Sequence, residues 1–348
     1  MAGNQPTAVR PSVARRSGER APLRIALVGA GAMGSLHARV VNQHSRADLA
    51  AIVDIDQAAG RAAADRFECP YLGDLESGAF DAVIVASPTD THLDWVTRAL
   101  ELRLPVLVEK PMALDLTDTR AMIERAAALD VPITCGFIER WNPAVMLAIE
   151  IVKEPLYLQA FRHSPYVPRI RGGVTGDLLI HDVDLALRFF GGAPTHVQAR
   201  LGFFHPQSEA NAEDVAEAQL TFAGGGLATV SASRIGQQKV RQLRVHDLDR
   251  MLEVDLLRQD VTVFRHVGNE FEESGAYRQQ TVIDIPVIAN RREPLVAQLE
   301  HFVALIGGHL DHAAERATLL APHEVIDRVL DDARGPGPER PPAEGDSR

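Results

Sequence analysis

The chain has 348 residues, a formal net charge of −11 and a hydrophobic fraction of 46%, which suit a globular protein of two domains. The acidic balance argues against a nucleic-acid or membrane-surface partner, and no apolar run approaches the roughly 20 residues of a membrane-spanning helix. Two cysteines, Cys69 and Cys135, are too few for a disulfide framework or a cysteine-based zinc site.

The two ends of the chain differ in composition from the rest. Residues 1–21 are basic and contain Arg15 and Arg16, but the segment that follows this arginine pair has the pattern of a buried strand and not of a signal sequence. Residues 334–348 are of low complexity and rich in proline and glycine. We expect both ends to be disordered and the protein to be cytoplasmic.

The N-terminal half alternates short apolar runs with helical patterns. Expected strands cover 23–29, 48–54, 81–87, 105–111 and 131–137, and expected helices cover 32–43, 57–67, 91–101 and 116–129. Continuous apolar strands that alternate with helices predict a parallel, doubly wound sheet. We assign this α/β arrangement to a first domain over residues 22–142.

The turn after the first strand has the pattern GxGxxG, from Gly29 to Gly34, and opens a helix. In such a turn the first glycine allows the bend, Gly31 lets the backbone approach a pyrophosphate, and Gly34 lets helix and strand pack closely. Asp54 ends the next strand, where a carboxylate accepts hydrogen bonds from ribose hydroxyls and repels a 2′-phosphate. A glycine-rich turn without a ligand is the alternative.

This pattern predicts a Rossmann-type dinucleotide site. No arginine or lysine directly follows Asp54, which favours NAD over NADP. The strand over 81–87 ends at Ser87, and the strand over 105–111 ends in Glu109-Lys110-Pro111; ligands of open α/β sheets bind at such carboxyl ends. A solvated Glu-Lys pair in an exposed loop is the alternative for the second segment. Expected cofactor contacts from these segments are Gly29, Gly31, Ala32, Met33, Gly34, Asp54, Ile55, Ser87, Thr89, Glu109 and Lys110.

The C-terminal half follows a different pattern, with a helix over 144–153 and then strands whose apolar residues alternate. These strands cover 155–163, 215–222, 226–234, 240–247, 250–256 and 260–266. Alternation of this kind predicts a large, mostly antiparallel open sheet with one covered face. We assign it to a second domain over 143–333, in which an amphipathic helix over 293–308 returns to the first domain.

A helix expected over 176–192 carries charged residues inside an apolar sequence. At about 100° per residue, Asp177, His181 and Asp184 share one stripe. Aspartate is a poor residue for a helix interior. One interpretation makes Asp177 the N-cap, with the other two solvated. The other is a carboxylate that holds an imidazole inside a cleft.

Residues from about 23 to 332 resemble the Gfo/Idh/MocA family, named for glucose–fructose oxidoreductase and inositol dehydrogenase. The resemblance rests on GAGAMG, Asp54, SPTDTH, EKP, GFIERWNP and DLLIHDVD. It implies a Rossmann domain, then an α/β domain whose open sheet forms homodimers or homotetramers. It also adds His92 to the cofactor side and implies Lys110, Asp177 and His181 as catalytic residues. The chain departs from the common pattern at Leu179, where glycine is usual.

The resemblance gives the three catalytic residues separate tasks in the oxidation of a CH–OH group. His181 would take the hydroxyl proton, Asp177 would orient its ring, and Lys110 would stabilise the developing alkoxide. The order in which Lys110 and His181 handle the proton stays open. Asp184 is expected to be structural.

Basic residues before this helix point to the substrate. The segment FRHSPYVPRIRGG, with Arg140 ahead of it, suits a diphosphate better than an uncharged polyol. A solvated loop is the alternative. Together with ERWNPAV, it resembles the family branch that contains UDP-N-acetylglucosamine 3-dehydrogenases. We therefore expect a sugar-nucleotide substrate, with an inositol or free sugar as the alternative. Expected substrate contacts are Arg140, Trp141, Asn142, Arg162, Tyr166, Arg169 and Arg171.

Two other classes of protein stay open. A cofactor-binding regulator could keep the fold without the chemistry, although intact Lys110, Asp177 and His181 argue against it. A metal-dependent sugar epimerase could seat a cation on Asp-x-x-x-His, but further well-placed ligands are missing, so we expect no metal.

Overall fold

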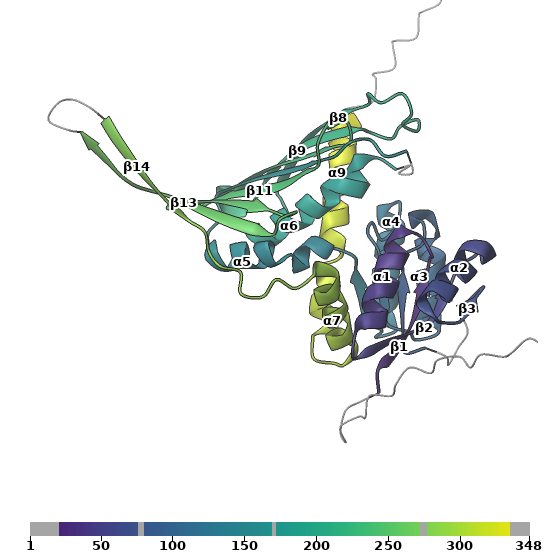
Figure 1. Cartoon of the computed structure of the whole chain (residues 1–348). Helices are drawn as coiled ribbons and strands as arrows, with labels where there is room; N and C mark the ends of the chain where they lie inside the picture. Colours follow the sequence, from purple (N-terminus) through teal and green to yellow (C-terminus); the bar gives the residue numbers. More distant parts are fainter. Residues whose placement is uncertain (1–20, 76–79, 169–171, 272–276, 335–348) are drawn as a thin grey trace, which may run out of the picture.

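The computed structural model describes residues 21–75, 80–168, 172–271 and 277–334. It contains two sheets, and the chain passes from the first to the second and returns through its last helices (Figure 1). The predicted α/β class, with a parallel sheet followed by a mostly antiparallel one, is confirmed. Most of the two expected tails lies outside the described residues, including Arg15 and Arg16; the last helix, however, runs to Arg334.

The first sheet has six parallel strands in the order β3-β2-β1-β4-β5-β6. This is the doubly wound order, in which ligands bind where neighbouring connections diverge, between β1 and β4. The strands are β1 (Leu23–Val28), β2 (Ala47–Val53), β3 (Tyr71–Leu72), β4 (Ala82–Val85), β5 (Val106–Val108) and β6 (Ile133–Cys135). The intervening helices are α1 (Ala32–Gln43), α2 (Gln57–Phe67), α3 (His92–Glu101) and α4 (Leu116–Ala128). The two-residue strand β3 has no signal in the sequence pattern.

Helix α7 (Pro294–Ile306) comes late in the chain but packs beside α1 (Figure 1). Its Leu295, Leu299 and Phe302 share a buried cluster with Ile25 and Leu27 of β1. The predicted return of this helix to the first domain is therefore confirmed. The helix completes the apolar cover of one face of the parallel sheet, whose strands are buried on both faces.

The second sheet has eight strands in the order β14-β13-β12-β11-β7-β10-β9-β8, antiparallel except where β10 runs parallel to β7. The strands are β7 (Tyr157–His163), β8 (His196–Gly202), β9 (Val215–Thr221), β10 (Leu227–Ser233), β11 (Val240–His246), β12 (Met251–Asp255), β13 (Asp260–Phe271) and β14 (Tyr277–Asp284). Strands β8 and β14 were not expected from the sequence. The hairpin of β13 and β14 extends beyond the other strands (Figure 1).

Helices cover one face of this second sheet, as the alternating pattern predicts. In β7, Leu158, Ala160 and Arg162 are buried while the intervening residues are half-buried. The helices are α5 (Pro143–Ile151), α6 (Ile180–Phe190) and α9 (Leu320–Arg334), which lie on the same side of the strands in Figure 1. The short helix α8 (His312–Ala317) precedes α9 and contacts β6 of the first sheet. Of these, α8 and α9 were not expected. None of the helices in the described residues is long and apolar enough to span a membrane.

The last helices join the two sheets. The backbone N–H of Met112, after β5, donates to His323 Nε2 on α9 at 3.1 Å, and Thr134 of β6 donates to Glu315 of α8. Helix α9 also contacts β8 of the second sheet. The predicted division at 142/143 stays a prediction, but these contacts fix the position of β5 relative to the second sheet.

Candidate active site

The glycine turn between β1 and α1 has the geometry that its spacing predicts. Gly29 has φ +100°, and a Cβ there would lie 2.6 Å from the Ala86 carbonyl oxygen. A Cβ on Gly34 would lie 1.9 Å from the Gly29 carbonyl oxygen. Glycine is therefore required at the first position for the bend and at the last for close packing of the helix against the strand.

The middle glycine of the turn faces open space. A Cβ on Gly31 would meet no atom within 4 Å, and Gly31 caps α1 without a side-chain hydrogen bond. The first backbone N–H groups of a helix have no partner within it and attract anions. Open space in front of these N–H groups fits the pyrophosphate of a dinucleotide, with Ala32 exposed and Met33 half-buried at the same place.

Asp54 directly follows β2 and fixes two loops. Its Oδ2 accepts from the Ala30 N–H at 2.7 Å and its Oδ1 from the Asp56 N–H at 2.8 Å. A carboxylate oxygen has two lone pairs, so each oxygen can accept one further hydrogen bond. The side chain is held beside the glycine turn, where it can bind ribose hydroxyls, and Ile55 next to it is 79% exposed.

The segment after β4 is tied to the loop after β5. Half-buried Ser87 and Thr89 lie at this strand end, and Ser87 Oγ is 2.8 Å from Thr91 Oγ1. His92 is 1% exposed, and its Nε2 lies 2.9 Å from the Ser87 carbonyl oxygen while its Nδ1 lies 3.1 Å from that of Pro111. The expected contact of His92 with a cofactor is corrected, because the buried ring holds two loops together.

Glu109 is buried at the end of β5, directly before Lys110. It is 6% exposed, its Oε1 is 2.7 Å from His37 Nε2, and a Cβ on Gly136 would lie 2.6 Å from its Oε2. Burial opposes its ionisation, but His37 and Lys110 hold the pKa of the Glu109 carboxyl below its usual value. These contacts give Glu109 a structural role, and its expected contact with the cofactor stays a prediction. No pattern in the sequence indicates a role for His37, whose partner is 72 residues away.

Lys110 reaches from the end of β5 to the second domain. Its Nζ donates to the Asp177 carbonyl oxygen at 2.6 Å and to Asp177 Oδ1 at 2.8 Å. An ammonium has three N–H donors, so one stays available to a ligand. Burial disfavours a charged Asp177, but Lys110, then Arg234 and Arg241, keep the pKa of its carboxyl below the ordinary value.

The position of Asp177 contradicts both interpretations of the segment from 176 to 192, in which it is either an N-cap or the partner of His181. It lies inside a π-helical turn, Thr175–Leu179, that precedes α6, so it is not an N-cap. No hydrogen bond joins it to His181 in the described structure; its partner is Lys110. The π turn changes the spacing on which the one-stripe argument depends, and an ammonium is a stronger partner than a neutral imidazole. Leu179, at the departure from the family pattern, is fully buried in the core.

His181 is the buried imidazole of the site. It is 8% exposed, and its Nδ1 is buried with no hydrogen-bond partner in the described part of the chain. Burial, followed by the nearby charges of Lys110, Arg162 and Arg241, holds the pKa of His181 well below its ordinary value. The ring is therefore neutral near pH 7 and can accept a proton.

The other aspartates of the stretch are buried and paired, not solvated. Asp184 accepts from Arg140 Nε at 2.9 Å and from its Nη2 at 2.6 Å, which makes it structural as expected. Asp182 accepts from Arg162 at 2.9 and 2.8 Å, and Arg162 also donates to Glu139 at 2.9 Å. The assignment of Arg140 and Arg162 to a substrate diphosphate is therefore corrected, because internal carboxylates already bind both guanidinium groups.

Of the other expected substrate contacts, Asn142 and Tyr166 lie in the described part of the chain and both have internal partners. Asn142 is 2% exposed and caps α5, so it is corrected to a structural residue. Tyr166 donates to the Gln207 carbonyl oxygen at 2.7 Å and stacks on His205. Arg169 and Arg171 lie outside the described residues.

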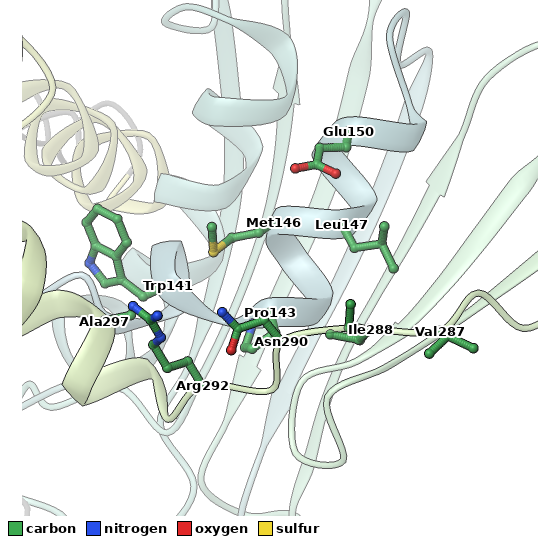
Figure 2. Close-up of a pocket in the computed structure, with 11 residues that line it drawn as sticks. Trp141, Pro143, Met146, Leu147, Glu150, Val287, Ile288, Asn290, Arg292 and Ala297 are labelled. Carbon is green, nitrogen blue, oxygen red and sulfur yellow. The ribbon is translucent and has the colours of Figure 1, made fainter.

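Trp141 lines a different hollow of the molecule, a pocket of about 460 Å³ between α5 and the segment leading into α7. Figure 2 shows Trp141, Met146 and Arg292 around this pocket. None of Lys110, Asp177 and His181 lines it. Trp141 also packs against His301, with ring centroids 4.4 Å apart. These positions give no support to a substrate contact for Trp141.

The second sheet brings to the site cations that no sequence pattern indicated. Arg241 of β11 is the register partner of Arg162 in β7, and its side chain is 31% exposed. Lys239 precedes it, and Arg234 follows β10. The segment SRIGQQKVR contains all three, but only the folded structure shows that Arg241 lies near His181 and Asp177, and Arg234 near Asp177. Within the described ranges, no cluster of three or more His, Cys, Asp or Glu residues could hold a metal ion.

Family models and known proteins match most of the chain. The model of the oxidoreductase family with an NAD-binding Rossmann fold matches residues 23–137, and the GFO/IDH/MocA C-terminal domain matches 156–249. UDP-N-acetylglucosamine 3-dehydrogenase of Acidithiobacillus ferrooxidans is 29% identical over 87% of this chain and 96% of its own length. Inositol 2-dehydrogenase of Rhizobium meliloti is 30% identical over 61% of this chain and 69% of its own.

Solved structures show the same fold. The Acidithiobacillus ferrooxidans enzyme superposes with a TM-score of 0.75 at 27% identity and covers 90% of this chain and 100% of its own. An oxidoreductase from Agrobacterium radiobacter in complex with NAD+ has a TM-score of 0.77 at 20% identity, over 90% of this chain and 96% of its own.

Proposed function

Because the chain belongs to the Gfo/Idh/MocA family of oxidoreductases with an NAD-binding Rossmann fold, we propose that it is an NAD-dependent dehydrogenase of nucleotide sugars. Its reaction would oxidise a ring hydroxyl to a ketone, as in UDP-N-acetylglucosamine 3-dehydrogenation, or reverse that step. The proposal depends mainly on the pairing of Lys110 with Asp177 beside a buried, neutral His181. These groups lie where the end of β5 meets the second domain.

Lys110, Asp177 and His181 each have a distinct task. His181 accepts the hydroxyl proton at Nε2, since Nδ1 is buried. Lys110 directs its third N–H at the substrate oxygen, where it stabilises the negative charge that develops. Asp177 is a positioning residue, because it holds the lysine through two oxygens. The order of proton transfer between Lys110 and His181 stays open.

The dinucleotide would be held by the glycine turn and by Asp54. The open space at Gly31 receives the pyrophosphate, and the Asp54 carboxylate binds the ribose hydroxyls and excludes a 2′-phosphate. This arrangement supports NAD over NADP. When bound, the dinucleotide supplies hydride transfer at its nicotinamide ring. The residues of the chain bind it, orient the sugar and handle the proton.

A nucleotide sugar is favoured as substrate by the similarity to UDP-N-acetylglucosamine 3-dehydrogenase over nearly the whole chain. Inositol or a free sugar is the second candidate, because several inositol dehydrogenases are about equally similar over a shorter stretch. We further propose a homodimer or homotetramer through the face of the second sheet that carries no helices. The cytoplasmic location and the absence of nucleic-acid and membrane partners stay predictions.

A substrate panel tests the proposal. The purified full chain is mixed with NAD or NADP and with UDP-N-acetylglucosamine, myo-inositol or glucose, and reduced dinucleotide is followed by absorbance. We expect reduction of NAD with UDP-N-acetylglucosamine at the highest kcat/KM of the panel. Preference for myo-inositol would establish the second candidate. Binding of NAD without turnover of any substrate would favour a regulator, and activity abolished by a chelator would favour a metal enzyme.

A further inference from the structure

Arg241 is a cation that lacks a close partner. Its guanidinium lies 3.6 Å from Glu139 Oε1, too far for a hydrogen bond, and donates to no side chain in the described part of the protein. That same Glu139 oxygen already accepts from Arg162 at 2.9 Å. Arg241 thus shares a carboxylate with a fully buried arginine, and nearly a third of its own side chain is exposed.

The surroundings of Arg241 carry an excess of positive charge. Arg162 neutralises one of the two carboxylates that face it, Glu139 and Asp182, which leaves one negative charge for Arg241 and the nearby Lys239. Asp177, the third carboxylate that acts on Arg241, is already paired with Lys110. The charge of Arg241 is the largest cause of a lowered pKa of Lys239, and burial together with Arg162 lowers the pKa of Arg241 itself. Uncompensated cations that are partly shielded from solvent attract anions.

This excess of charge lies close to the reacting groups. Arg162 binds Asp182, which is the next residue after His181 in α6. Since Arg241 is the register partner of Arg162, its side chain leaves the sheet on the same, helix-covered face. The charge of Arg241 also affects both Asp177 and His181. Exposed Lys239 lies two residues before Arg241, at the entry to β11.

We propose that Arg241, with Lys239 beyond it, binds the anionic group of the substrate while Lys110 and His181 act on a hydroxyl of its sugar ring. This inference rests on the proposed function and deepens it, because it assigns the diphosphate of a nucleotide sugar to residues of β11. The planar guanidinium of Arg241 suits two parallel hydrogen bonds to phosphoryl oxygens. A sugar carboxylate offers the same chemistry, so the experiment must separate the two sources of negative charge.

The test compares R241Q with a matched control, R244Q. Arg244 lies three residues along the same strand, leaves the opposite face, and donates to Glu253 at 3.1 Å. Steady-state constants are measured with UDP-N-acetylglucosamine, glucuronate and myo-inositol. We expect R241Q to raise the KM for UDP-N-acetylglucosamine about tenfold or more relative to R244Q. The factor by which R241Q raises the KM for myo-inositol should be at least tenfold smaller than that for UDP-N-acetylglucosamine.

Lys239 supplies a second variant that does not depend on the folding of R241Q. Lys239 is exposed, so K239Q should fold normally and raise the same KM by a smaller factor, about threefold. Equal KM values for UDP-N-acetylglucosamine in the wild type, K239Q, R241Q and R244Q would overturn the inference and leave the proposed function intact.

The other outcomes separate the inference from the proposed function. If the wild type oxidises glucuronate but not UDP-N-acetylglucosamine, and R241Q raises the KM for glucuronate, the nucleotide-sugar proposal is wrong. The anion site at Arg241 then stands, with a carboxylate as its ligand. If the wild type oxidises only myo-inositol, both proposals are overturned.

Discussion

Lys110 and Asp177 lie 67 residues apart in the sequence, yet Nζ of the lysine donates to both the carbonyl and a carboxylate oxygen of the aspartate. This contact joins the end of β5 to the π turn before α6, and hence the dinucleotide domain to the second domain. The aspartate therefore serves the lysine, and the neighbouring histidine stays neutral for a different reason, namely burial among cations.

Asp177→Asn should slow turnover without weakening the binding of NAD. The amide keeps an oxygen for Lys110 but loses the charge, so the lysine is held less firmly and kcat should fall roughly tenfold to a hundredfold. Because the carboxylate does not contact the glycine turn, the Kd of NAD measured by fluorescence should stay at the wild-type value. A normal kcat would remove Asp177 from the positioning role. Asp177→Ala should be slower than Asp177→Asn.

The glycine turn gives a contrast between two alanine variants. Gly31→Ala adds a methyl group to open space at an ordinary φ of −70°, so the melting temperature should not change, while NAD should bind at least roughly tenfold more weakly. Gly34→Ala forces a contact with the Gly29 carbonyl and should lower the free energy of unfolding by about 1–3 kcal/mol. Unchanged NAD binding by Gly31→Ala would contradict a pyrophosphate at this turn.

Cofactor choice is tested with Asp54→Asn. Loss of the charge weakens the hydrogen bonds to ribose and removes repulsion of a 2′-phosphate, so the ratio of NAD to NADP affinity should fall roughly tenfold. Asp48→Asn removes the same charge from an exposed position of the same strand and is the control. Isothermal titration calorimetry of both dinucleotides decides the point. Equal ratios in the two variants would show that Asp54 does not select the cofactor.

The stability of the protein should depend on a buried histidine of α9. Burial lowers the pKa of His323 from 6.5 to about 4, and the charge of Arg140 acts in the same direction. A hydrogen bond to the Leu319 carbonyl opposes this shift. Between these values the unfolded state binds a proton that the folded state does not, so the free energy of unfolding falls as pH decreases. Above the unfolded pKa this effect vanishes.

His323→Gln removes the group that binds this proton. The free energy of unfolding should therefore fall less steeply as pH decreases, by up to about 1.4 kcal/mol per pH unit. Urea unfolding between pH 4 and 6.5 measures the slope independently of any overall loss of stability in the variant. Buried His92 and His181, whose pKa values are also lowered, should leave part of the slope in place. A slope identical to that of the wild type would contradict a neutral His323.

The sequence predicted those parts of the site that depend on local backbone geometry. Gly29, Gly31 and Gly34 act within one turn, so their spacing alone indicates their roles. Arg140 and Arg162 look like available charge in the sequence because their partners, Asp184 and Asp182, are 44 and 20 residues away. Arg241 reaches the site only through the pairing of β11 with β7, which the two-residue alternation of a strand does not specify.

The central claim is that Lys110 and His181 carry out the chemistry of a sugar dehydrogenase, and turnover by Lys110→Met and His181→Ala tests it most directly. With UDP-N-acetylglucosamine and NAD as substrates, kcat should fall roughly 10² to 10⁴-fold in each variant. The Kd of NAD should stay within a few-fold of the wild-type value. A kcat near that of the wild type in either variant would contradict the claim for that residue.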